Sequence, residues 1–184
     1  HFLRTGGFIE ALSFNESQRE RYFKEGLLER VIFRDIPVEY TVRVPDLLYQ
    51  LTRILAQKPG MYLDYRNLAN DLGYDQRTIA EYFSYLTHAL LVSKLYNFAP
   101  NRLTSEKKMK RAYLSNTAFT NALSAETDAS LVLEQFFINC FKGQFFSRTP
   151  QRDEIDLILT TDGGVVPIEV KIRRDIKSRD ANPL

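Results

Sequence analysis

The chain of 184 residues is long enough to bury a sizeable core, as one compact domain or as two small ones. Its hydrophobic (44%) and charged (26%) fractions are ordinary for a soluble globular protein, and a formal net charge of +2 does not by itself require a nucleic-acid partner. One cysteine, Cys140, excludes an intrachain disulfide and a thiolate zinc site, and the two histidines are too few for a histidine-rich metal site, so carboxylates and Mg²⁺ or Mn²⁺ are the expected combination.

The first segment, residues 1–44, is predicted to be helical. Apolar residues recur at helical spacing between residues 16 and 34, with charged residues on the opposite face; they are Tyr22, Phe23, Leu27, Leu28 and Val31. Pro37 disfavours the helical conformation at Ile36, so we expect the helix to end there.

The second segment, residues 45–115, is predicted to be a winged helix. Pro45 suits the first turn of one helix, and Asp64 and Asp75 can cap two more. A strand is predicted over 91–96, a loop containing Pro100 follows, and a second strand is predicted around 111–114. Three short helices followed by a two-stranded ribbon is the winged-helix order, a variant of helix-turn-helix.

The third segment, residues 116–184, is predicted to change from helix to sheet. After a weak helix around 118–123, a helix begins at Ser130, and strands are expected over 144–148, 154–160 and 165–173. The turn Asp162-Gly163-Gly164 is predicted to join the last two strands as a hairpin. We expect the buried side of the helix to consist of Leu131, Leu133, Phe136, Phe137, Cys140 and Phe141.

Charged residues in the last two strands form the main chemical signal. Residues two apart on a strand point to the same face, so Glu169 and Lys171 are expected to project together, with Ile168, Val170 and Ile172 buried behind them. The neighbouring strand can bring Asp156 alongside. Carboxylates within apolar strands need a partner, and a divalent cation is one such partner.

Asp156, twelve intervening residues and then Glu169-Val170-Lys171 resemble the motif of the PD-(D/E)XK nuclease superfamily. The resemblance implies that Asp156 and Glu169 hold Mg²⁺ or Mn²⁺, and that Lys171 helps to position or activate the attacking water. It also implies that Glu134, on the preceding helix, completes the metal site. The fold class implied is α+β, in which a helical winged-helix region precedes a nuclease-like α/β unit.

The resemblance extends over nearly the whole chain. The segments Phe2–Glu10, Arg34–Ile36, the winged helix and Ile168–Lys171 occur in this order in the C-terminal half of a group of prokaryotic AAA-type ATP-binding proteins. This similarity implies that residues 1–44 are lid-like and that an N-terminal ATPase domain is a partner. No G-x-x-x-x-G-K-[ST] is present, so ATP would bind only through that preceding domain.

Two expectations follow from the ends of the chain. The chain opens with His1 rather than with methionine, and we expect further sequence before it. Thirteen residues follow Lys171, so the nuclease-like unit is expected to be incomplete at its C-terminus. No signal peptide and no apolar run of membrane-spanning length are visible, which predicts a cytoplasmic protein without a membrane partner.

Two basic clusters could contact the phosphates of DNA. The first surrounds the predicted wing and contains Arg102, Lys107, Lys108, Lys110 and Arg111. The second follows the predicted active strand and includes Arg173 and Arg174. On the third helix Arg77 is the only outward cation among polar residues, and contacts with proteins or other domains are as compatible with this helix as contacts with DNA.

Three functions are consistent with these patterns. The leading hypothesis is the C-terminal module of an AAA-type ATPase that cleaves or binds DNA with the help of magnesium. The first alternative is a non-enzymatic winged-helix scaffold with an inactive nuclease fold, and the second is a regulator that reads duplex DNA through the helix over 75–88. Whether the chain is an enzyme therefore depends on the carboxylates.

Overall fold

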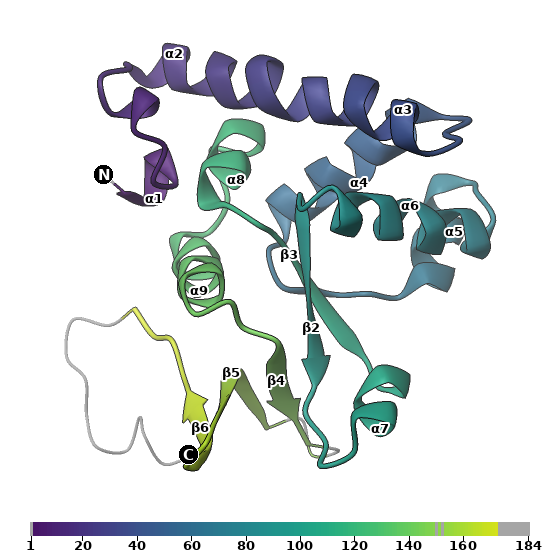
Figure 1. The fold of residues 1–184 in the computed structure, drawn as a ribbon, viewed down its shortest axis with the longest axis vertical. Helices are drawn as coiled ribbons and strands as arrows, with labels where there is room; N and C mark the ends of the chain where they lie inside the picture. Colours follow the sequence, from purple (N-terminus) through teal and green to yellow (C-terminus); the bar gives the residue numbers. More distant parts are fainter. Residues whose placement is uncertain (1, 150, 152, 173–184) are drawn as a thin grey trace.

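Most of the helices gather at one end of the molecule, and a sheet extends from them toward the other end, where the short helix over 102–107 lies (Figure 1). The structure is a computed structural model that describes residues 2–149, 151 and 153–172, with only the backbone of Arg102 included. Among the helices in these ranges, none combines the length and the apolar character needed to cross a lipid bilayer.

The N-terminal segment ends in a long helical rod that lies across the top of the molecule (Figure 1). Its elements are α1 (Phe2–Thr5), η1 (Glu10–Leu12), α2 (Glu16–Arg21), η2 (Tyr22–Glu29), η3 (Val31–Asp35) and α3 (Ile36–Glu39). The predicted helix is confirmed, but the predicted end at Ile36 is wrong. The rod is π-helical over η2 and η3, and Pro37 falls in the first turn of α3, a position that tolerates a residue without an N–H.

The middle segment contains the three predicted helices and two predicted strands in the predicted order, and it has in addition a short strand before the second helix and a short helix between the two predicted strands. Its elements are α4 (Pro45–Gln57), β1 (Met61–Tyr62), α5 (Tyr65–Leu72), α6 (Gln76–His88), β2 (Val92–Asn97), α7 (Arg102–Lys107) and β3 (Lys110–Leu114). As predicted, the side chains of Asp64 and Asp75 accept hydrogen bonds from the first N–H groups of α5 and α6. The predicted loop after β2 instead contains α7, which the side chain of Asn101 caps.

The C-terminal segment contains the predicted helices and strands, with two differences. Its elements are α8 (Thr117–Leu123), α9 (Ala129–Cys140), β4 (Phe145–Arg148), β5 (Glu154–Thr161) and β6 (Gly164–Ile168). The strand predicted over 165–173 ends at Ile168, and Ile172 is 55% exposed rather than buried. Residues 169–172 continue without regular strand pairing, and the predicted strand end at residue 173 lies outside the described ranges.

The buried face of α9 differs from the prediction. Cys140 and Phe141 are exposed, whereas Val132, Glu134, Gln135 and Ile138 are buried. Apolar residues occur all around this helix, so their periodicity does not identify the face that packs inward. The buried polar residues decide it, because Glu134 and Gln135 find their hydrogen-bond partners inside the protein.

Among the described residues, a six-stranded sheet in the order β1-β3-β2-β4-β5-β6 joins the middle and C-terminal segments. All neighbours are antiparallel except β2 and β4, which pair in parallel through Tyr96–Phe145 and Asn97–Phe146. The sheet crosses the predicted segment boundary at 115–116, and the prediction of a mixed helical and β-sheet fold is confirmed.

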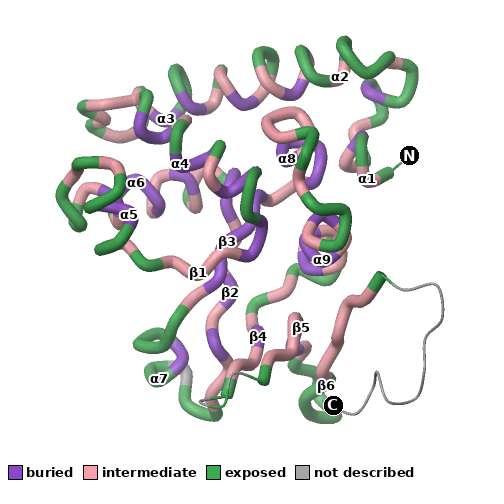
Figure 2. The backbone as a smooth tube through the Cα atoms, turned by 180° about the vertical axis from the view of Figure 1, so that it is seen from behind, coloured by how far each residue is buried: buried purple, intermediate pink, exposed green. Residues whose placement is uncertain are grey.

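Two apolar clusters lie on opposite sides of the central strands. The larger cluster unites α4, α5, α6, α8 and the helical rod with the helical side of β2 and β3. The smaller cluster contains Leu95, Tyr113, Ile138 and Phe146, and it packs α9 against the other side of the sheet. Figure 2 shows this buried centre where the strands meet the helices. Beyond it, β5 and β6 extend toward solvent.

Gln135 fixes α9 in place. Its Oε1 accepts a hydrogen bond from the hydroxyl of Thr120 on α8, and its Nε2 donates to the carbonyl oxygen of Leu114 on β3, both at 2.8 Å. Gln135 is fully buried, so water cannot replace either partner.

Replacing Gln135 with leucine should therefore lower the free energy of unfolding by about 1–3 kcal/mol, because the Thr120 hydroxyl loses its acceptor in a buried position. Urea denaturation followed by circular dichroism measures this difference. Gln50→Leu, on the exposed side of α4, is the matched control and should change the stability by less than about 0.5 kcal/mol. Equal effects of the two substitutions would contradict the assigned role of Gln135.

Candidate functional site

The face of the sheet that packs under α9 also carries a cluster of charged residues. Alternation along the strands brings Arg111 and Tyr113 of β3, Glu154 and Asp156 of β5, and Glu134 of α9 into contact with one another. Apolar residues of the smaller cluster border them, so the charges are partly removed from water.

The guanidinium group of Arg111 lies at the centre of this cluster. Its Nη2 is 2.6 Å from Glu134 Oε1, and its Nη1 is 2.9 Å from Glu154 Oε1 and 3.7 Å from Asp156 Oδ1. The contacts of Nη1 are charge contacts rather than aligned hydrogen bonds. The side chain is 8% exposed, so these interactions act in a poorly screened environment.

The backbone of Gly60 completes the surroundings of Arg111. Its carbonyl oxygen accepts a hydrogen bond of 2.8 Å from Arg111 Nε. Gly60 has a φ of +77°, which favours glycine, and a Cβ at this position would lie 2.4 Å from Arg111 Nη2 and 2.6 Å from the Tyr113 hydroxyl. A residue with a side chain therefore cannot occupy position 60 without displacing the arginine.

Two tyrosines donate short hydrogen bonds to the carboxylates that Arg111 contacts. The Tyr113 hydroxyl donates to Glu134 Oε1, and the Tyr62 hydroxyl donates to Glu154 Oε2, both at 2.5 Å. Burial and the bond to Glu154 raise the pKa of Tyr62 to about 12. Burial also raises the pKa of Tyr113, so both phenols remain protonated donors at neutral pH.

Asp156 and Glu169 form the other side of the cluster. The backbone N–H of Val170 donates to Asp156 Oδ2 at 2.9 Å, which holds the 169–171 segment beside β5. Lys171 Nζ lies 3.5 Å from Glu169 Oε1. Within the part of the chain that the structure describes, Glu169 Oε2 is buried and has no hydrogen-bond partner.

Two partly buried acids lie side by side here, and the pKa of each is raised although Lys171 lies near both. Burial raises the pKa of Asp156. Burial raises the pKa of Glu169 as well, and the neighbouring charge of Asp156 raises it further. An unpartnered carboxylate oxygen beside a second carboxylate suits a hard cation such as Mg²⁺ or Mn²⁺, which prefers oxygen ligands.

The structure thus brings Asp156, Glu169 and Lys171 together, as the sequence predicts, although Glu169 and Lys171 lie beyond the end of β6. Glu134 is close as well, but it faces Arg111 and Tyr113. Over the described ranges no three Asp, Glu, His or Cys side chains are arranged to hold a metal together. The predicted third ligand is thus engaged by a protein cation.

The cluster also contains residues that the sequence analysis did not single out. Arg111 was assigned to the basic cluster at the wing, but it is buried in the site; Gly60, Tyr62, Tyr113 and Glu154 were not assigned to the site. Alternation on β3 places Arg111 and Tyr113 on one face, which was the one available signal. Nothing in the local sequence indicates that this face meets α9.

Arg148 lies next to the carboxylates on the adjacent strand. It is the direct cross-strand neighbour of Glu154, and its guanidinium stacks on the ring of Tyr62, with the guanidinium carbon 4.6 Å from the ring centroid. Glu154 already contacts Arg111 and Tyr62. Arg148 is half-buried and no acidic partner is recorded for it among the described side chains, so its donors can reach a further anion.

The basic residues at the predicted wing divide into two groups. Lys107 and Lys108 are exposed, and Lys108 Nζ donates to the carbonyl oxygen of Phe98. Lys110 lies over the ring of Tyr96 and 3.9 Å from a carboxylate oxygen of Glu106. The side chain of Arg102, and both Arg173 and Arg174, lie outside the described residues.

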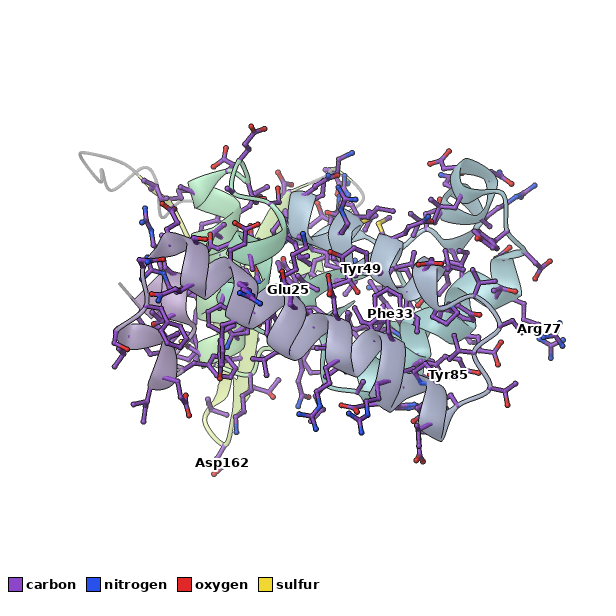
Figure 3. The ribbon with its side chains drawn as sticks, turned by 90° about the horizontal axis from the view of Figure 1, so that it is seen from above. Glu25, Phe33, Tyr49, Arg77, Tyr85 and Asp162 are labelled. Carbon is purple, nitrogen blue, oxygen red and sulfur yellow. The ribbon has the colours of Figure 1, made fainter. Side chains whose placement is uncertain are left out.

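Helix α6 has exposed residues along its whole length, namely Gln76, Arg77, Glu81 and His88. Arg77 projects from its N-terminal turn at the edge of the molecule (Figure 3). Farther along, Tyr85 donates a hydrogen bond to Glu81, and the ring of Tyr40, which follows α3, stacks on Tyr85 with a centroid separation of 4.4 Å. Tyr40 therefore covers part of the second half of α6, at Tyr85.

Comparison with known proteins assigns a family but no activity. Residues 1–130 match the family model described as a domain of unknown function (DUF8612), and the chain therefore belongs to this family. No curated protein and no solved structure gives a significant match. The matched segment includes Gly60, Arg111 and Tyr113 and ends before Glu134.

Replacing Glu169 with glutamine should raise the thermal unfolding midpoint at pH 7 in EDTA. The pKa of Glu169 is higher in the folded protein than in the unfolded chain, so the unfolded chain loses this proton first as pH rises. The stability of the wild type therefore falls as pH rises above about 4.3, the ordinary pKa of glutamate. Glutamine removes that loss. The gain should therefore disappear at pH 3.5, below the pKa in the unfolded chain. A gain that is equal at both pH values, or present in the exposed control Glu126→Gln, would contradict this account.

Proposed function

We propose that this member of the DUF8612 family binds a divalent cation through Asp156 and Glu169 and uses it to cleave a phosphodiester bond in DNA. The observation that carries the proposal is the buried Glu169 Oε2, which lacks a hydrogen-bond partner among the described residues while Asp156 and Lys171 lie beside it. A carboxylate pair with an adjacent lysine has the composition of a metal-dependent phosphodiesterase site.

Each residue of this group has a distinct role in the proposal. Asp156 and Glu169 provide the carboxylate oxygens, and the N–H of Val170 fixes the orientation of Asp156. A bound divalent cation would polarise the scissile phosphate and lower the pKa of water. Lys171 stabilises negative charge that develops on the phosphate. Arg148, stacked on Tyr62, offers a guanidinium to a neighbouring phosphate of the same strand.

Residues 1–115, the helical part of the chain, provide the proposed contacts with DNA and with an ATPase domain. We propose that α4, β1, α5, α6, β2, α7 and β3 form a winged helix; the pairing of β1 and β2 with β3 supports this. We propose that α9 and strands β4, β5 and β6 form a nuclease-like unit attached to it. The similarity to AAA-type proteins suggests that residues 1–44 contact an ATPase domain, and that ATP acts through that domain. Arg77 and the exposed lysines Lys107 and Lys108 are the proposed DNA contacts of the helical part.

One observation favours a second function, that of a non-enzymatic scaffold. Arg111 already neutralises Glu134 and contacts Glu154 and Asp156, so the cluster has a cation of its own. In a scaffold the cluster would serve only to hold α9 and β5 to the central strands. The two functions differ first in whether Mn²⁺ binds at Asp156 and Glu169 and, if it binds, in whether the protein cleaves DNA.

The metal site is tested by thermal unfolding with and without Mn²⁺. Mn²⁺ at about 100 times its dissociation constant should stabilise the wild type by about 2.7 kcal/mol, because it binds only the folded protein. Asp156→Asn should lose this gain. Asp162→Asn, at the exposed tip of the β5–β6 hairpin (Figure 3), is the matched control and should retain it. If the wild type gains nothing from Mn²⁺ or Mg²⁺, the scaffold function is favoured.

Cleavage is tested with single- and double-stranded DNA in Mn²⁺, with the conversion of substrate to product followed on gels. Lys171→Met should lower the rate about 10²–10³-fold through the loss of charge stabilisation, while leaving the Mn²⁺-dependent thermal shift in place. Asp156→Asn should abolish cleavage, and Asp162→Asn should not change it. A wild type that gains stability from Mn²⁺ without cleaving either substrate would refute the enzymatic proposal and leave a metal-binding scaffold.

A further inference from the structure

We infer that Arg111 is a built-in counter-ion that limits the carboxylate cluster to one divalent cation, with Glu134 excluded from the metal ligands. The inference rests on the proposed function, because it assigns that cation to Asp156 and Glu169. It concerns the other half of the cluster, where Glu134 and Glu154 face the guanidinium.

The contacts of Arg111 leave little room for a second cation. The two terminal nitrogens of the guanidinium each reach a different glutamate, at 2.6 and 2.9 Å, and the Nη1 atom also lies 3.7 Å from Asp156. The guanidinium therefore occupies the space between three carboxylates. A metal ion placed there would meet the positive charge of Arg111 at contact distance.

The surroundings of Arg111 hold it in this position. The Gly60 carbonyl oxygen accepts from Nε, and the backbone of Gly60 lies so close that a Cβ would be 2.4 Å from Nη2. The rings of Tyr113 and Phe146 lie 5.3 and 5.8 Å from the guanidinium carbon. Both ends of the Arg111–Glu134 pair are about nine-tenths buried, so swinging the guanidinium out would leave a buried, unpaired Glu134.

Asp156 separates the two halves of the cluster. Its Oδ1 faces Arg111 at 3.7 Å, while its Oδ2 accepts from Val170 on the Glu169 side. Glu169 has its ion contact with Lys171 and none with Arg111 among the described interactions. The arginine thus neutralises one half, and the other half keeps its negative charge for the metal.

Removing the guanidinium should convert the neutralised half into a second metal site. In Arg111→Met, Glu134, Glu154 and Asp156 lose the cation that they share. Their side chains would have to move toward one another to bind Mn²⁺, because no three described acids are arranged to hold a metal in their present positions. Neighbouring carboxylates are the usual ligands of hard divalent cations, including those in two-metal sites. The wild type should bind one Mn²⁺ per chain and Arg111→Met should bind two.

The experiment counts bound Mn²⁺ by equilibrium dialysis, with free Mn²⁺ measured by electron paramagnetic resonance. Arg148→Met removes a neighbouring arginine that does not contact Glu134, and it should still bind one ion. Arg111→Met combined with Glu134→Gln should fall back to one ion, because the second site loses a ligand. These two variants separate the effect of Arg111 from a general loss of positive charge.

The possible counts have distinct meanings. Two ions in the wild type, or one ion in a folded Arg111→Met variant, would overturn the inference. No ion in the wild type and one in Arg111→Met would refute the proposed metal site at Asp156 and Glu169 while supporting Arg111 as the counter-ion. No ion in either protein would refute both.

Loss of folding in the variant is also informative. Arg111→Met in EDTA should unfold more readily than the wild type, because Glu134 loses its ion pair. If the second Mn²⁺ takes the place of the guanidinium, Mn²⁺ should raise the unfolding midpoint of the variant by more than that of the wild type. A variant that remains unfolded in excess Mn²⁺ would overturn the inference.

Discussion

The ion contacts of Arg111 hold the two halves of the sequence together. The arginine lies on β3, and its partners come from the turn before β1, from α9 and from β5. A guanidinium has five N–H donors in a planar fork, so a single side chain can serve partners from several directions. Burial makes each contact stronger and also makes the loss of one partner costly, on the order of 3–5 kcal/mol for a buried pair. The position of α9 over the sheet depends on this group and on Gln135.

The same arrangement divides the charge unevenly across the cluster. Glu134 receives the shortest contact with the guanidinium and a hydrogen bond from Tyr113, and these partly offset the burial that raises its pKa. Asp156 is farther from Arg111, and the Glu169 beside it has one buried oxygen without a recorded partner in the described part of the chain. A protein interior that leaves one carboxylate oxygen unsatisfied tolerates a cost of about 1–3 kcal/mol or more. Such costs are typical of sites that bind a ligand.

Local sequence signals predicted much of the fold. Asp64 and Asp75 mark the starts of α5 and α6 because their side chains bond to the nearest backbone N–H groups, and the Asp162–Gly164 turn marks the hairpin between β5 and β6. Asp156, Glu169 and Lys171 were likewise predicted together, from their spacing and their resemblance to a known motif. These features depend on residues that are close in sequence or on one hairpin.

The remaining features depend on contacts between distant residues. Arg111 lies among lysines in the sequence, and only its contact with α9 distinguishes it from a surface cation. Glu134 was identified as part of the site, but its partners, 21 and 23 positions earlier in the chain, could not be read from α9 alone. The buried face of α9 was predicted wrongly for the same reason. A helix with apolar residues on every side gives no periodic signal, and the partners of its polar residues determine its orientation.

A Cβ at residue 60 would overlap the guanidinium of Arg111, so the residue at one position limits which residues the other can accept. A methyl group at residue 60 and the guanidinium at residue 111 exclude each other, and the left-handed backbone at residue 60 adds a second preference for glycine. A lineage that keeps the arginine is therefore bound to keep the glycine. A lineage that loses the arginine still has the backbone preference and the Tyr113 hydroxyl, 2.6 Å from a Cβ at residue 60, to favour glycine there. Its carboxylates at 134 and 154 would need to become neutral or to acquire another cation. Sequences of the family that have arginine at position 111 should accordingly have glycine at position 60, although 51 positions separate the two in the chain.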